Sequence, residues 1–464
     1  MSKLQYGAGF ATMNFHPGNA NLMKKNQKPE GRSVSFVSLG CFKNTVDSEV
    51  LAGMLKKRGM EIVSEYENPD WLVINTCGFI RDAKEESIEE ILGALEKKEK
   101  GEIKKLAVFG CLIQRYRQEL KAAFKNVDIL WGVNDMEELA DAMAKDQPDE
   151  YPNKNLFLYS DRHQRLPFTT PGSTFIKISE GCNMTCSFCS IPMIRGPYRS
   201  RPIISILKEA EHLKKQGIEE LNLISQNSTY FGKDRGKQSQ LPELLKKISG
   251  LGFRWLRVLY LMPEEITEEI LAAFTWPSIL PYFDLPFQHV SARILKKMQR
   301  GGNFKKNMQL VQHIRNMFPQ AVFRSTFIVG FPGEEEDDFK QLLEFAAETA
   351  IERIGVFGFS LEENTASCKL PQRKKPQTIE NRKNCLLDIS DRNLQKYNQT
   401  LIGQAMDFLP LAPWTNGSTI GRISSQAPEV DGHCEINEKF TETFKLFPIK
   451  ITGFQSEMLF GENR

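Results

Sequence analysis

Alternation of strand-like and helix-like segments is the feature of this sequence that most restricts its fold. Between residues 174 and 400, six short β-rich runs alternate with segments whose apolar residues recur at helical spacing. Strands joined by helical crossovers pair in parallel. The six strands span about 190 residues, from 174 to 359, which is too few for a closed eight-stranded barrel, so we expect an open, partial (βα) barrel of six units. The expected strands are residues 174–179, 220–224, 255–260, 282–285, 322–328 and 353–359.

The same alternation precedes this region and predicts a Rossmann-like parallel sheet, giving an α/β fold class overall. Cys41, Cys77 and Cys111 each follow the end of one expected strand. Because open parallel sheets bind ligands at the carboxyl ends of their strands, the three thiols could share a ligand there. In the plainer alternative, the three cysteines are only small buried residues at strand ends. The sequence of this region does not decide between a shared ligand and this structural role. The strands in question are residues 34–39, 71–74 and 106–109.

Beyond residue 401 the helical pattern stops and short β-type runs follow one another between Gly, Pro and Asn. Five such runs in about 60 residues predict a small, OB-like β-barrel. The runs are residues 405–409, 418–423, 432–436, 444–452 and 455–459.

These patterns divide the chain into a disordered polar tail and three domains. The tail lacks the apolar core of a secretory signal, and no run of about 18 apolar residues suggests a membrane span. Nine cysteines, an odd number, make a poor disulfide framework and favour the reducing cytoplasm. The net charge is only +3, which argues against a chain that binds nucleic acid over its whole surface. The expected boundaries are 1–32 for the tail, then 33–150, 168–400 and 401–464.

A loop with three cysteines directly after the first central strand is the strongest chemical signal. Cys182, Cys186 and Cys189 have the spacing Cys-x3-Cys-x2-Cys. Soft thiolates in this arrangement suit three irons of a 4Fe–4S cluster and leave the fourth iron open to a small molecule. A structural zinc site usually needs two Cys-x2-Cys pairs, and a thioredoxin-like site has no third thiol. The position at the end of a barrel strand, where catalytic loops lie, also favours the cluster.

This spacing resembles the radical S-adenosylmethionine (SAM) superfamily. The resemblance implies that the open iron binds SAM and that an injected electron releases a 5′-deoxyadenosyl radical. Other loops at the same face would then complete the SAM pocket, and our candidates are Gln226, Arg324, Gly330 and Gly333. Glycines let the backbone approach a ligand closely at a helix start, although this glycine pair is also typical of an ordinary turn.

The order of the three domains resembles the methylthiotransferase family, from about residue 33 to the end. The resemblance implies that Cys41, Cys77 and Cys111 bind a second 4Fe–4S cluster and that the C-terminal barrel is a TRAM domain. One branch of that family modifies an adenosine in transfer RNA, and the other an aspartate of the twelfth small-subunit ribosomal protein. Several stretches are similar to the second branch: residues 39–49, 75–80, 85–87, 110–116, 191–202 and 284–289.

Four positions depart from the pattern of that branch. Phe42 stands where Pro is usual, Asn227 where we expect Asp, Asn364 where we expect Gly, and Gln426 where Asp is usual. Asn227 lies near the expected active face, so its role is in question.

The resemblance implies a division of labour between the two clusters. One cleaves SAM, the radical removes a hydrogen from the aspartate β-carbon, and the other delivers sulfur, which a second SAM methylates. The expected partners are the ribosomal protein, free or on the ribosome, and a reductant protein such as flavodoxin or ferredoxin. Modification of transfer RNA is the alternative. A third hypothesis is a non-catalytic RNA- or ribosome-binding module that contains zinc.

Charge gives a separate indication of the partner. Residues 401–464 contain eight acidic and five basic side chains, a balance that suits a basic ribosomal protein better than RNA phosphates. The preceding segment points the other way and could touch ribosomal RNA. Its basic residues are Lys369, Arg373, Lys374, Lys375, Arg382 and Lys383.

Overall fold

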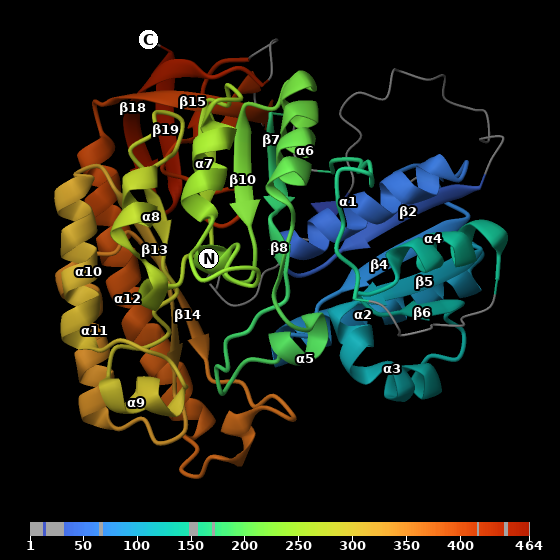
Figure 1. Ribbon diagram of the computed structural model, residues 1–464, viewed down its shortest axis with the longest axis horizontal. Helices are drawn as coiled ribbons and strands as arrows, with labels where there is room; N and C mark the ends of the chain where they lie inside the picture. Colours follow the sequence, from blue (N-terminus) through green and yellow to red (C-terminus); the bar gives the residue numbers. More distant parts are fainter. Residues whose placement is uncertain are drawn as a thin grey trace.

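The computed structural model describes residues 13–14, 32–64, 68–147, 156–168, 172–414, 417–439 and 444–463. Figure 1 shows an N-terminal sheet domain in blue and teal, a central half-barrel from green to orange, and a red C-terminal barrel. Within the described residues, no helix is long and apolar enough to cross a bilayer. The tail expected at residues 1–32 lies outside the described part, apart from Arg32 and a two-residue strand, β1 (Met13–Asn14), which pairs antiparallel with β2.

The N-terminal domain is the expected parallel sheet, in the order β1-β2-β4-β5-β6 with β3 beside β2. Its two faces have separate cores, because successive strand residues point to opposite sides. Val34 and Phe36 pack on one face with α1 and α4, whereas Leu72 and Ile74 pack on the other with α2 and α3. The elements are β2 (Ser33–Ser38), α1 (Phe42–Lys57), β3 (Glu61–Ile62), β4 (Trp71–Thr76), α2 (Arg81–Glu99), β5 (Lys105–Gly110), α3 (Cys111–Ala123), β6 (Ile129–Trp131) and α4 (Met136–Lys145).

The central domain has the six expected strands as two parallel three-stranded sheets, β7-β10-β11 and β12-β13-β14. A bridge between Leu256 and Ile279 joins them into one open half-barrel. The strands are β7 (Ser173–Lys177), β10 (Glu220–Ile224), β11 (Trp255–Val258), β12 (Tyr282–Asp284), β13 (Val322–Val329) and β14 (Arg353–Gly358). The helices are α6 (Ile203–Lys215), α7 (Leu241–Ser249), α8 (Glu268–Ala273), α9 (Ala292–Lys297), α10 (Phe304–Met317), α11 (Glu336–Thr349) and α12 (Pro376–Leu401).

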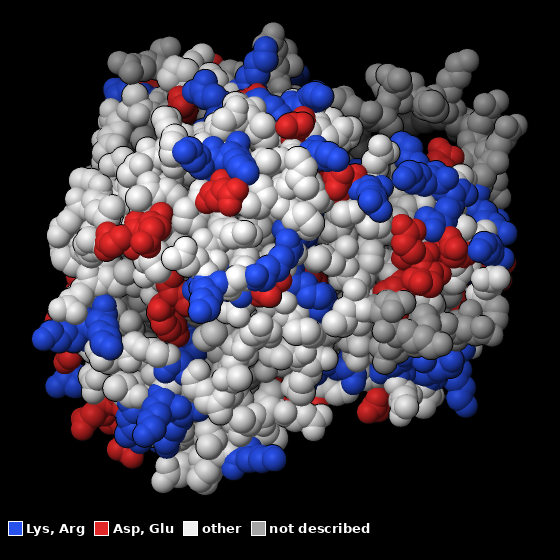
Figure 2. Space-filling model, in the orientation of Figure 1, with Lys and Arg blue, Asp and Glu red and all other residues white. Residues whose placement is uncertain are grey.

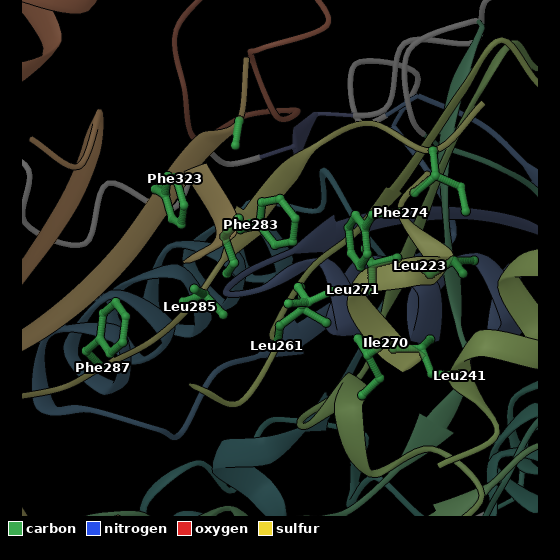
Figure 3. Close-up of a cluster of buried hydrophobic side chains, with 14 of the residues drawn as sticks. Leu223, Leu241, Leu261, Ile270, Leu271, Phe274, Phe283, Leu285, Phe287 and Phe323 are labelled. Atoms are coloured by element: carbon green, nitrogen blue, oxygen red, sulfur yellow. The ribbon is translucent and has the colours of Figure 1, made fainter. Parts of the chain in front are cut away.

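One large apolar core fills the space between the half-barrel and its helices. Figure 3 shows Phe283 between Phe274 and Phe323, with ring centroids 4.6 and 5.7 Å away. Burying each large apolar side chain stabilises the fold by about 1.5–3 kcal/mol, so this core fixes the strand ends that carry the site.

The C-terminal domain is a closed five-stranded barrel in the order β15-β16-β17-β19-β18. Buried ions dock it to the half-barrel: Glu220 of β10 binds Arg422 of β16 at 2.5 Å and Arg257 of β11 at 3.2 Å. Two of the charges counted in residues 401–464, Arg422 and Asp431, are therefore buried and do not face a partner. On the face drawn in Figure 2, basic and acidic side chains are interspersed. The strands are β15 (Ala405–Pro413), β16 (Thr419–Ile423), β17 (Cys434–Ile436), β18 (Phe447–Gln455) and β19 (Met458–Asn463).

Candidate functional site

Cys41, Cys77 and Cys111, here called the N-terminal triad, lie together at the carboxyl edge of the N-terminal sheet. Each follows one of the neighbouring parallel strands β2, β4 and β5. They are near enough that Cys41 and Cys111 add to the rise that burial causes in the pKa of Cys77. A Cβ at Gly40, whose φ is +92°, would lie 2.7 Å from the Cys77 Cβ. The close approach of residue 40 to Cys77 therefore needs glycine.

Asn44 holds the strand ends of this triad in register. Its Nδ2 donates to the carbonyl oxygens of Leu39 at 2.8 Å and Thr76 at 3.2 Å. The backbone N–H of Cys77 donates to Ser87 Oγ at 3.0 Å. These bonds join the ends of β2 and β4, so the triad rests on a rigid edge.

Cys182, Cys186 and Cys189, here called the loop triad, line one cavity of about 420 Å³. Their loop lies between β8 (Ser179–Glu180) and α5 (Ile191–Arg195). Met184, Thr185 and residues 364–366 complete the wall. Ser187 fastens the loop to α9, because its Oγ donates to the Lys297 carbonyl at 2.8 Å.

The thiols of both triads are chemically suited to bind an iron–sulfur cluster. Burial raises the pKa of all three loop thiols, that of Cys189 to about 12, because a buried thiolate lacks solvation. Iron would supply the missing positive charge and deprotonate them. Within the ranges that the structure covers, no three His, Cys, Asp or Glu side chains converge closely enough to hold a single metal ion. Each set has three thiols, which would bind three irons of a 4Fe–4S cluster and leave the fourth iron open.

A buried ion network joins Cys111 of the N-terminal triad to the segments that flank the loop triad. Arg195, at the end of α5 and six residues after Cys189, donates through Nη2 to Cys111 Sγ at 3.3 Å and to Asn44 Oδ1 at 2.7 Å. Its Nη1 binds Asp47 of α1 at 2.6 Å and Glu180 at 3.2 Å. One guanidinium thus contacts a thiol of the N-terminal triad while belonging to the segment that follows the loop triad.

Lys177 completes this network, with its ammonium bound to both Asp47 and Glu180. Burial by itself would raise the pKa of Glu180, but Lys177 and Arg195 hold it well below its usual range. Sequence reasoning missed this network. Asp47 and Arg195 lie in two of the stretches that are similar to the family, residues 39–49 and 191–202. Nothing local in the sequence links these two residues, which are 148 positions apart.

The four predicted SAM-pocket residues have different surroundings. Gln226 lies beside the ion network and donates to Glu180 Oε1 at 2.9 Å, while its own Oε1 is buried without a hydrogen-bond partner among the described residues. Arg324 ion-pairs with Asp284 at 3.5 Å and with Asp431 of the C-terminal barrel at 3.7 Å. Their contact with SAM stays a prediction.

The glycine loop after β13 closes on itself. The backbone N–H groups of Gly330 and Phe331 both donate to the Glu334 carboxylate. A Cβ at Gly330 would meet Ile379 of α12, whereas one at Gly333 would meet the Lys297 amine. The glycines therefore serve a tight turn in this structure, and a role toward SAM stays a prediction for both.

Asn227, the departure near the expected active face, has a structural function. Its Oδ1 accepts from the backbone N–H of Tyr230 at 3.2 Å and from Thr229 Oγ1 at 2.6 Å, which caps a short turn after β10. Its Nδ2 donates to Glu265 at 3.2 Å. Aspartate could supply the two acceptor bonds but not the donor to Glu265.

Comparison with known proteins places these features in a family. Residues 33–132 match the Uncharacterized protein family UPF0004, and residues 176–346 match the Radical SAM superfamily. The solved structure of the radical SAM methyltransferase TsrM from Kitasatospora setae, with cobalamin and a 4Fe–4S cluster bound, has a TM-score of 0.52 and 15% identity over 73% of this chain and 77% of that chain. This likeness concerns the fold alone.

Curated relatives match over nearly the whole chain. The ribosomal protein uS12 methylthiotransferase RimO of Syntrophotalea carbinolica is 38% identical over 448 residues, covering 95% of this chain and 98% of that protein. RimO of Prosthecochloris aestuarii is 41% identical over 407 residues, covering 86% and 90%. With both domain matches and this identity along its length, the chain belongs to the RimO family of radical SAM methylthiotransferases.

Proposed function

We propose that this chain methylthiolates the β-carbon of an aspartate in ribosomal protein uS12. The observation that carries the proposal is the pair of three-thiol sets, with Arg195 reaching Cys111 from the segment that follows the loop triad. The names of the relatives supply the substrate, and the motif resemblance supplies the aspartate.

Two 4Fe–4S clusters and SAM, when bound, supply the radical, the sulfur and the methyl group. The protein holds and orients them. The N-terminal triad and the loop triad are the proposed ligands, and Gln226, with its unpaired buried Oε1, is the candidate for a hydrogen bond from SAM. Arg195 donates to Cys111 Sγ and so stabilises that sulfur as a thiolate.

The location and partners follow from the same proposal. uS12 would be met free or within the small ribosomal subunit, and a flavodoxin or ferredoxin would deliver the electron. These encounters place the protein in the cytoplasm.

Mass spectrometry of uS12 tests the function. We would incubate the anaerobically purified protein with SAM, dithionite and uS12, and expect the target aspartate to gain a methylthio group in place of one hydrogen. A uS12 variant with asparagine at that position should remain unmodified. If uS12 stayed unchanged and transfer RNA gained a methylthioadenosine, the transfer-RNA alternative would replace this proposal.

A further inference from the structure

Lys43 is a buried cation at the junction of the N-terminal domain and the half-barrel. It is the second residue of α1 and only 7% exposed. Its Nζ donates to the Ser225 carbonyl at 3.2 Å and lies 3.4 Å from the centre of the Tyr260 ring. Ser225 and Tyr260 lie just after β10 and β11, so the ammonium points at the carboxyl ends of the half-barrel strands.

This ammonium lies near one thiol of each triad. Lys43 follows Cys41 of the N-terminal triad by two positions. It is also near enough to Cys182 of the loop triad to oppose the rise that burial causes in the pKa of that thiol.

Lys43 differs from the other buried cations around it because it has no carboxylate partner among the described residues. An unpaired ammonium away from water is costly, whereas a paired one is tolerated. Lysine also has three N–H donors, of which the Ser225 carbonyl takes one and the Tyr260 side chain a second. The neighbouring cations with carboxylate partners are Lys177, Arg195, Arg300 and Arg324.

The ring over Lys43 is held by a strained backbone. Tyr260 has φ +61°, a left-handed conformation that bulky residues rarely adopt. Its N–H donates to Asp284 Oδ2 at 2.9 Å, and its carbonyl accepts from the Ser228 N–H at 2.9 Å. Strain of this kind persists where the surrounding structure fixes it, commonly at binding sites. The ring covers one side of the ammonium.

We propose that Lys43 binds the side-chain carboxylate of the target aspartate. The inference rests on the proposed function, which supplies an aspartate as the substrate. The methionyl carboxylate of SAM has the same chemistry, but SAM would be held at the loop triad, whereas Lys43 comes from the opposite domain beside Cys41. The position near one thiol of each triad therefore favours the group that must approach both.

A two-by-two binding experiment tests the proposal. Fluorescently labelled uS12, with the target aspartate either kept or replaced by asparagine, is titrated against the anaerobic holoenzyme and its Lys43→Met variant. We expect the wild type to prefer the aspartate form by at least about tenfold, the worth of a charged hydrogen bond. In Lys43→Met, the preference should fall below about twofold. Lys43→Arg keeps the positive charge and should retain most of the preference for the aspartate form.

Lys56→Met is the matched control, since this lysine lies on the same helix α1 but is exposed. It should preserve the full preference. Iron content and the melting temperature show whether each variant is assembled, and Lys43→Gln replaces Lys43→Met if the latter loses iron. A separate titration with SAM distinguishes the two carboxylates.

Three outcomes are distinct. Loss of the aspartate preference with unchanged SAM affinity supports the proposal. An unchanged preference in Lys43→Met, with or without weaker SAM binding, overturns it. Failure of the wild type to bind or modify uS12 at all overturns the proposed function instead.

Discussion

Removing the charge of Glu220 should loosen the joint between the half-barrel and the C-terminal barrel. Glu220, Arg257 and Arg422 are all fully or almost fully buried, and the carboxylate is the shared counter-ion of the two guanidinium groups. The variant Glu220→Gln keeps the shape of the side chain but leaves two buried cations without an opposite charge. Breaking a buried pair in this way costs more than the pair itself contributes.

The magnitude follows from the pKa of this carboxyl. Arg422 and Arg257 outweigh the effect of burial and lower the pKa of Glu220 from 4.5 to about 2. At about 1.4 kcal/mol for each pH unit, the ionised form is favoured by about 3 kcal/mol. For a unit of 150–250 residues, this loss lowers the melting temperature by about 6–12 °C.

The pH dependence has a definite sign. Because the folded pKa is depressed, the contribution is fully present above the unfolded value of 4.5 and is lost as pH falls from there toward about 2. The difference between wild type and Glu220→Gln should therefore be constant from about pH 6 to 8 and narrow below about pH 4.5.

Differential scanning calorimetry of the anaerobic proteins measures this difference. Glu219→Gln is the matched control, because the neighbouring Glu219 forms a half-buried pair with Lys214 at 2.9 Å. Such a pair contributes about 0–1 kcal/mol. A melting shift in Glu220→Gln no larger than in Glu219→Gln at pH 7 would refute the reasoning.

Two further variants test the supports of the triads. Arg195→Met removes the hydrogen bond to Cys111 Sγ and the ion pairs with Asp47 and Glu180, so we expect a lower reduction potential at the N-terminal cluster and weaker iron retention. A potential unchanged in an EPR-monitored titration would contradict this role. Gly181→Ala places a Cβ 2.1 Å from the Pro197 carbonyl oxygen, and should cost the loop triad its iron. Gly59→Ala has the same φ of +79° with open space around it, and should keep the full iron content.

The strand–helix alternation predicted the N-terminal sheet and the half-barrel, and the short β-type runs beyond residue 401 predicted the C-terminal barrel, because local periodicity reports which face is buried. The predicted strand at 220–224 coincides with β10, and all five strands of the C-terminal barrel were expected. Helix α1 begins at Phe42, just after the first cysteine of the N-terminal triad. Its first turn is polar yet buried against the half-barrel, so hydrophobic spacing gave no sign of it. The strand β6 and helix α4 were not predicted.

The cysteine spacing and strand-end positions identified both triads as candidates. The residues of the buried ion network could not be found in this way, since Asp47, Lys177 and Arg195 meet only after the two domains dock. Lys43 looks in the sequence like any polar residue at a helix start. Only its burial beside Tyr260 distinguishes it.

The content of iron and acid-labile sulfide per chain shows whether both triads hold a 4Fe–4S cluster. We expect about eight of each in the anaerobically purified wild type, because each 4Fe–4S cluster contributes four. Replacing the three cysteines of either triad by alanine should leave about four. About four irons in the wild type, with no loss when the N-terminal triad is replaced, would contradict the account.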